Sequence, residues 1–173
     1  DIKLIILKES WTITPSFSYF DESIENKGYP RAPYGEFAFD ETYKTYRYAP
    51  AITLNKYSGN HKLWNVIFSW SKFIRHKNRL STDLTTLNST ILSNPEANDT
   101  TLVHQVLTRG SRNFIFHSPV SLTLGWDINR ESLSGARIID NFKEITDAAT
   151  FMQLGYKKKS SSIQLGVRKA WNS

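Results

Sequence analysis

The sequence contains no cysteine and only one methionine in 173 residues. Without cysteine, neither a disulfide framework nor a thiolate metal site can form. The mean hydropathy is −0.43, and no apolar run approaches the ~20 residues that a membrane-spanning helix needs. These absences exclude a helical membrane protein. They leave open a membrane β-barrel, because barrel strands are apolar on one face only and are polar on average.

The first residues, Asp1 to Lys3, lack the charged and apolar regions of a signal peptide, so we expect a mature chain or a piece of a longer one. The formal net charge is +6, from 22 Lys and Arg against 16 Asp and Glu. The densest basic runs are 72–79 and 157–159. Positive charge suits phosphate-rich partners such as lipopolysaccharide. Only Phe73 lies beside the first run to stack on bases, which argues against single-stranded nucleic acid.

Residues 119–131 show the clearest pattern in the chain. Apolar side chains occupy every second position, and small or polar side chains fill the positions between them. Successive side chains of a strand point to opposite faces, so this segment predicts a strand with one apolar face. The apolar positions are Val120, Leu122, Leu124, Trp126 and Ile128.

Seven further segments carry a similar or weaker alternation, and the connections between them alternate between short and long. The segments are 2–7, 11–20, 43–57, 64–71, 101–112, 150–156 and 163–171. We therefore predict an all-β fold: an antiparallel up-and-down meander of about eight strands in a single region, 1–173. With all its long loops at one end, such a meander has the layout of a transmembrane β-barrel, part of which we expect here.

The composition of the two predicted faces favours a membrane over water. The polar face carries mostly Ser, Thr, Gly, Asn and Ala, whereas the water-facing side of a soluble protein normally carries more Lys and Glu. Aromatic rings at strand ends are typical of membrane interfaces. Those on the apolar face are Trp11, Tyr19, Trp64, Trp70, Trp126, Tyr156 and Trp171. A soluble, lipocalin-like ligand binder with its apolar face inward is the alternative.

The second half of the chain carries a series of short motifs in a fixed order. They are Gly125-Trp126-Asp127, Gly135-x-Arg137-Ile138, Ile145-x-Asp147, Phe151 and Gly166-x-Arg168. Together with residues 77–87, this order resembles the barrel of TonB-dependent outer-membrane receptors of the Bacteroidota type. The resemblance covers about two thirds of the chain. The family's plug domain and its TonB-pairing segment have no counterpart here.

The resemblance implies an outer-membrane receptor that takes up a scarce nutrient, such as a siderophore, haem, cobalamin or an oligosaccharide. Its partners would be the lipid bilayer and lipopolysaccharide, with TonB and a surface lipoprotein engaged through parts outside this chain. The alternative is a small self-closed eight-stranded barrel acting as an adhesin or pore. No enzyme and no cofactor is expected, because the candidate acid–base pairs, Asp83 with Ser81 and His104 with Ser111, lack a third partner.

Ligand-binding residues are expected on the external loops. The connection 21–42 offers four aromatic side chains, Tyr29, Tyr34, Phe37 and Phe39, which either bind a ligand or pack the loop onto the rim. Arg137 matches the family's loop pattern and is suited to an anionic ligand or to pairing with a nearby Asp. The acidic residues of the first connection do not match a calcium-binding loop, so no metal site is predicted.

Overall fold

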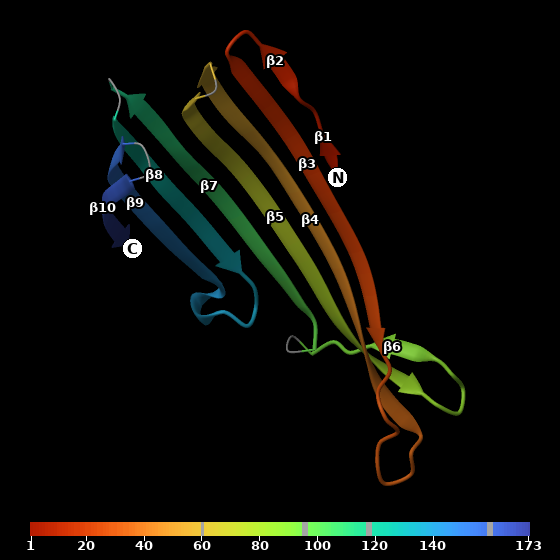
Figure 1. Ribbon diagram of the computed structural model, residues 1–173. Helices are drawn as coiled ribbons and strands as arrows, with labels where there is room; N and C mark the ends of the chain where they lie inside the picture. Colours follow the sequence, from red (N-terminus) through yellow and green to blue (C-terminus); the bar gives the residue numbers. More distant parts are fainter. Residues whose placement is uncertain (60, 95–96, 117–118, 159–160) are drawn as a thin grey trace.

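The protein folds as one antiparallel β-sheet whose strands follow one another in chain order (Figure 1). The computed structural model describes residues 1–59, 61–94, 97–116, 119–158 and 161–173. The predicted all-β meander is confirmed. The residues outside these ranges, 60, 95–96, 117–118 and 159–160, all fall in connections between the predicted strands.

Seven long strands form the sheet. They are β3 (Trp11–Asn26), β4 (Phe37–Ser58), β5 (His61–Asp83), β7 (Asp99–Ile115), β8 (Val120–Ser134), β9 (Phe142–Lys158) and β10 (Ser161–Asn172). Short strands β1 (Ile2–Lys3) and β2 (Ile6–Lys8) pair with β3, and β6 (Ser89–Ile91) pairs with β5. A single 3₁₀ turn, η1 (Ile139–Asn141), precedes β9. Each of the eight predicted strands is present, the first as β1 and β2.

Pro15 explains why the first predicted strand is divided. Proline has no N–H to donate to a ladder and is tolerated at sheet edges. Between β1 and β2 the ladder beside Pro15 is reduced to one bond, in which Leu4 N donates to Pro15 O at 3.0 Å. Pro15 therefore lies opposite the gap between β1 and β2, which form the edge of the sheet beside β3.

Short connections gather at one end of the sheet and long connections at the other (Figure 1). We call these the turn end and the loop end. The sheet does not close on itself: among the described residues, β10 pairs with β9 alone, and the opposite edge is formed by β1 and β2 beside β3. The self-closed eight-stranded barrel is therefore not formed in this structure.

Strands β4 and β5 are longer than predicted, 22 and 23 residues, and their hairpin projects beyond the neighbouring strands at the loop end (Figure 1). Phe37 and Phe39 consequently lie in β4, and not in a connection. The prediction ended these strands where apolar alternation ends. The ladder continues beyond that point because pairs of charged and aromatic side chains across the strands take the place of apolar alternation. They include Lys77 with Glu41 at 2.9 Å and Arg75 over the Tyr43 ring at 4.7 Å.

One register row shows how the sheet is packed. Ile13, Leu54, Val66, Gly110 and Trp126 stand opposite one another on five successive long strands. The Trp126 indole covers Gly110, where an added Cβ would come within 2.2 Å of the ring. Glycine at this position therefore allows the aromatic ring to lie flat across the neighbouring strand.

This packing predicts that Gly110→Ala lowers the free energy of unfolding by about 1–3 kcal/mol, because the Trp126 ring must move. Denaturant unfolding followed by tryptophan fluorescence measures the change. The matched control is Gly166→Ala, also in a strand, where the nearest atom to an added Cβ is 3.6 Å away. Equal effects from the two substitutions would contradict the packing argument.

Candidate functional site

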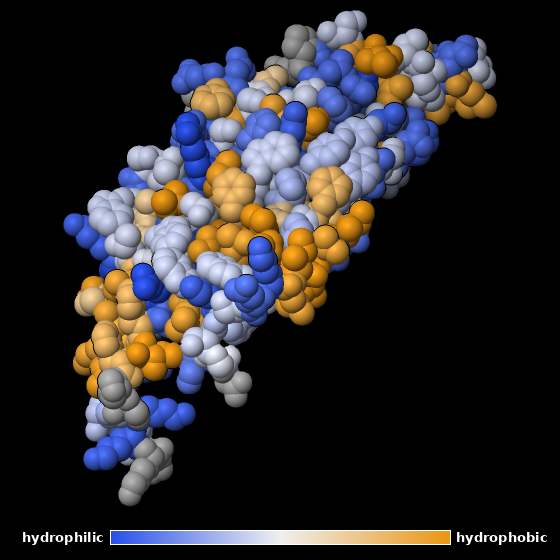
Figure 2. Space-filling model, turned by 90° about the horizontal axis from the view of Figure 1, so that it is seen from above, coloured by the Kyte–Doolittle hydropathy of each residue, from blue (hydrophilic) through white to orange (hydrophobic). Residues whose placement is uncertain are grey.

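The apolar face of the sheet, which carries Leu124, is exposed. Phe68 retains 48% of its accessible surface, Leu124 39% and Leu165 67%. From above, Figure 2 shows apolar side chains gathered in patches at the surface, with paler aromatic rings between them. No large side chain among the described residues is fully buried. The apolar side chains therefore do not form a dry interior.

On four of the seven long strands the apolar face forms a band of the same length. Counted with its border residues, of which Lys72 is one, the band spans 11–19 on β3, 64–72 on β5, 120–128 on β8 and 163–171 on β10, which is nine residues in each of these strands. Nine to eleven residues is the length that a tilted strand needs to cross a hydrocarbon layer.

Aromatic and cationic side chains border this band at both ends. At the turn end, Lys56 lies 5.3 Å from the Trp11 ring centre, and Arg112 lies 4.8 Å from that of Trp64. Towards the loop end, the rings of Tyr19 and Tyr48 are 5.2 Å apart, and those of Trp70 and His104 are 6.2 Å apart. Such pairs combine an apolar body with a polar tip, which suits the boundary between oil and water.

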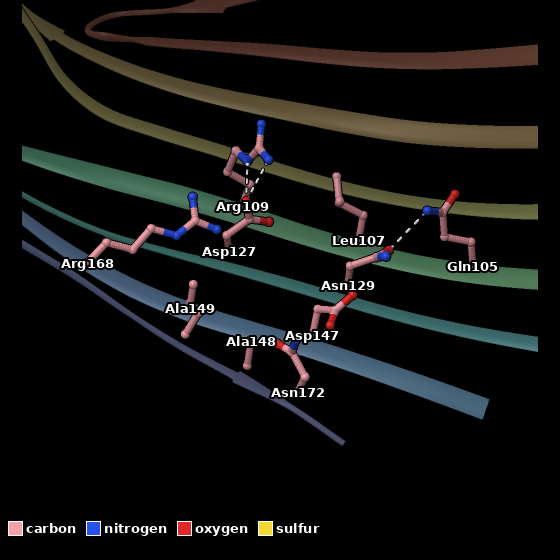
Figure 3. A pocket seen from close by; sticks show the side chains of 11 residues that line it. Gln105, Leu107, Arg109, Asp127, Asn129, Asp147, Ala148, Ala149, Arg168 and Asn172 are labelled. Carbon is pink, nitrogen blue, oxygen red and sulfur yellow. Dashed lines mark hydrogen bonds and ion pairs between the residues drawn. The ribbon is translucent and has the colours of Figure 1, made fainter.

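The opposite, polar face is linked by hydrogen bonds from strand to strand. Arg109 Nη2 donates to Asp127 Oδ2 at 2.6 Å, and Gln105 Nε2 donates to Asn129 Oδ1 at 3.0 Å (Figure 3). These side chains lie in a shallow hollow of about 370 Å³ that spans β7 to β10.

Burial is inverted relative to a soluble protein. Within the height of the band, Asn55 and Ala149 lie on the polar face and are 9% exposed or less, whereas large apolar side chains such as Phe68 and Leu165 on the other face are well exposed. A soluble sheet buries its apolar side.

The basic run 72–79 is divided between the two faces. It lies inside β5, where alternate residues face opposite ways. Lys72 shares the apolar face with Trp70, while Arg75, Lys77 and Arg79 lie on the polar face. Within this run, Lys72 therefore stands beside the apolar band, and the other three cations face the opposite way.

A larger hollow of about 890 Å³ opens at the loop end. We call it the loop-end hollow. It brings together residues from the β4–β5 hairpin and from the connections after β6 and β8. Its lining residues are Phe39, Arg79, Leu92, Asn94, Ala97, Ala136 and Arg137.

Two of the five predicted site residues, Phe39 and Arg137, line the loop-end hollow. Tyr29 and Tyr34 lie on the β3–β4 connection with 91% and 84% of their surface exposed, and neither lines the hollow. Phe37 opens β4 and is about half exposed. Of the predicted ligand-binding residues, the structure therefore brings Phe39 and Arg137 together in the loop-end hollow.

Arg79 is a residue of this hollow that the sequence did not single out as a ligand-binding candidate. It stands opposite Glu41 in the β4–β5 ladder, and its guanidinium lies 5.2 Å from the Phe39 ring centre. Side chains alternate between the two faces along β5. If this alternation is extended beyond residue 74, Arg79 falls on the polar face, near Phe39.

Asp40 anchors the connection beside this hollow. It is 4% exposed and accepts hydrogen bonds from Gly28 N at 2.9 Å and Thr82 Oγ1 at 2.8 Å. The Gly28 amide, followed by the Thr82 hydroxyl, holds the pKa of Asp40 below its usual value. Asp40 therefore stays charged at neutral pH and fixes the start of the connection that carries Tyr29.

Hydrogen bonding and strand geometry account for the polar residues that the sequence suggested as acid–base pairs. Asp83 accepts from the amides of Thr85 and Thr86, which keep its pKa low. His104 and Ser111 lie on opposite faces of β7, so they cannot act as a pair. Within the described part of the chain, no three His, Asp or Glu side chains come together in a group able to hold a metal ion.

Comparison of the chain with protein-family models, with curated proteins and with solved structures finds no match. Within the described ranges, no helix has the length and apolar character needed to cross a membrane.

We predict that Asp40→Asn, which keeps the side-chain volume and removes the charge, lowers the free energy of unfolding by about 1–3 kcal/mol at pH 7. The folded-state pKa lies below the unfolded value of about 3.9, so the stabilisation is complete above that pH and is lost as pH falls through the folded pKa. The difference between the two proteins should therefore shrink below about pH 4.

Denaturant unfolding at several pH values measures this difference, and hydrogen exchange at Gly28 reports the local effect. Asp21→Asn is the control, because among the described residues Asp21 accepts one long hydrogen bond, from Tyr19 at 3.4 Å. A pH-independent difference for Asp40→Asn would contradict the assigned role of its charge.

Proposed function

We propose that this chain forms part of the wall of an outer-membrane barrel, in a receptor and transporter of the TonB-dependent class that takes up a scarce nutrient. In this role its apolar face contacts lipid, its polar face lines the interior, and its loop end faces outward. The chain acts by binding and transport, and not by catalysis.

The inverted burial of the two faces carries this proposal. The apolar band carries well-exposed large side chains, spans nine residues on four of the long strands, and is bordered by aromatic and cationic side chains. A water-exposed band of this extent would drive aggregation, whereas hydrocarbon would stabilise it. The resemblance of residues 122–173 to the family's motifs supports the choice of receptor class.

The open edges of the sheet support a role within a larger wall. An unpaired strand edge inside hydrocarbon leaves backbone groups without partners, which costs several kcal/mol for each group. Since β10 pairs with β9 alone among the described residues, we propose that further strands complete the barrel. A small self-closed adhesin or pore would need β10 to pair with the opposite edge, formed by β1 and β2 beside β3.

The borders of the band support the proposed lipid partners. Lys72 and His104 stand opposite each other on the apolar face at its loop-end border, where the phosphates of lipopolysaccharide would lie. TonB and a surface lipoprotein would act through parts of the receptor outside this sheet.

The test uses two neighbouring residues of β8 that face opposite ways. Leu124→Arg should impair insertion into lipid vesicles and cost about 2–4 kcal/mol near the bilayer midplane. Thr123→Arg places the same charge on the polar face and should insert normally, apart from losing the Thr123 hydrogen bond to Asn113 at 2.6 Å, worth about 1 kcal/mol. Vesicle flotation and heat-dependent gel mobility measure insertion.

Equal effects of the two substitutions would contradict the assignment of the apolar face to lipid and of the polar face to the barrel interior. A monodisperse, water-soluble monomer obtained without detergent would favour the lipocalin-like alternative, in which the apolar face turns inward around a ligand.

A further inference from the structure

The turn end of the sheet carries the whole formal net charge of the chain. Of the 22 Lys and Arg, seven lie in the segments that form this end, whereas of the 16 Asp and Glu only Glu9 does. The remaining 15 basic and 15 acidic residues cancel, so the net charge of +6 belongs to the turn end. Each segment is a short connection with the strand residues next to it, and together they are 6–11, 56–64, 112–122 and 156–163.

No carboxylate balances this charge at the turn end. Among the described residues, none of the cations of these segments forms an ion pair. The positions of these segments outside the described ranges, 60, 117–118 and 159–160, hold no Asp or Glu in the sequence. All of the described cations except Lys56 are exposed. They are Lys8, Lys56, Lys62, Arg112, Lys157 and Lys158.

Aromatic rings hold two of these cations at the edge of the apolar band. The Arg112 guanidinium lies 4.8 Å from the Trp64 ring centre and 4.4 Å from that of Phe114, and Lys56 Nζ lies 5.3 Å from that of Trp11. These distances lie within the range of a cation–π interaction. Because Trp11 and Trp64 begin the band on β3 and β5, the charges lie where hydrocarbon would end and headgroup phosphates would begin.

The cations are spread along the turn end, and they do not converge on one point. They come from β2, β4, β5, β7 and β9, whose ends are distributed across the width of the sheet (Figure 1). A row of lipid headgroups offers a phosphate to each of them, whereas one small anion would reach only a few. A nucleic acid also offers a row of phosphates, but not the hydrocarbon that the adjoining apolar band needs.

We propose that the turn end binds the headgroup phosphates of an anionic phospholipid such as phosphatidylglycerol. Lys56 and Arg112 meet these phosphates at the edge of the band, and Lys157 and Lys158 meet them from the turn after β9. The inference rests on the proposed function, because it requires the apolar band to lie in lipid. It goes further by naming the headgroup chemistry at the turn end. Each Lys or Arg near an anionic membrane surface strengthens the association about fivefold.

The test measures partitioning of the protein, by flotation at low salt, into two kinds of vesicle. One is phosphatidylcholine alone, and the other is equal parts of phosphatidylcholine and phosphatidylglycerol. The unmodified protein should prefer the anionic vesicles, and this preference should fade as the ionic strength rises. Lys157→Gln combined with Lys158→Gln should lower the preference about 25-fold, since two charges are removed.

The ratio between the two kinds of vesicle separates headgroup binding from folding, because a folding defect lowers insertion into both. If the Lys157 and Lys158 variant does not insert into phosphatidylcholine, Lys8→Gln combined with Lys62→Gln takes its place. Both of these side chains are exposed cations of the same end.

Arg47→Gln combined with Lys143→Gln is the matched control. It also removes two exposed cations. These two stand in one register row on the polar face, linked through β5, β7 and β8, and lie outside the turn-end segments. The preference for anionic vesicles should therefore be unchanged.

Equal partitioning of the unmodified protein into both kinds of vesicle would overturn the proposal, as would equal losses in the turn-end variant and the control. Tight binding of a duplex DNA oligonucleotide without vesicles, weakened by the turn-end substitutions, would assign the cations to nucleic acid and would also overturn it. Normal insertion into phosphatidylcholine without a preference for phosphatidylglycerol overturns this inference alone. Failure of the unmodified protein to insert into either kind of vesicle contradicts the proposed function as well.

Discussion

In an antiparallel ladder, backbone hydrogen bonds fix which residues stand opposite one another, and successive side chains point to opposite faces. This constraint decides the chemistry of the whole sheet. It collects Ile13, Leu54, Val66 and Trp126 into one apolar row. A slip of one residue in any strand would turn its apolar side chains to the polar face. Register is therefore the property on which both faces depend.

The two faces are stabilised by different means. On the polar face, direct bonds such as Arg109 to Asp127 tie neighbouring strands together. On the apolar face, large side chains such as Phe68, Leu124 and Leu165 remain exposed, whereas others such as Val66 and Trp126 are half-buried against their neighbours. A sheet of this kind is stable only when its apolar side meets hydrocarbon or another apolar surface. The proposed place in a membrane supplies that missing contact.

Cations occur on both faces of the loop-end half, in different surroundings. Lys72 and His104 sit at the border of the apolar band, whereas Arg75, Lys77 and Arg79 face the opposite way along the extended hairpin. The first pair therefore lies on the apolar face and the second group on the polar face. A single basic run in the sequence is thereby divided between the two faces.

Local alternation in the sequence determined the fold class, the order of the strands and the apolar face, because a period of two is a property of each strand by itself. Predicting the strand ends failed at β4, β5 and β9, since charged and aromatic cross-strand pairs continue the ladder where apolar alternation stops. Only the tertiary structure decided that Phe39, Arg79 and Arg137 line one hollow. Their proximity depends on the register across β4, β5, β7 and β8 and on the length of the hairpin, and no short stretch of sequence encodes either.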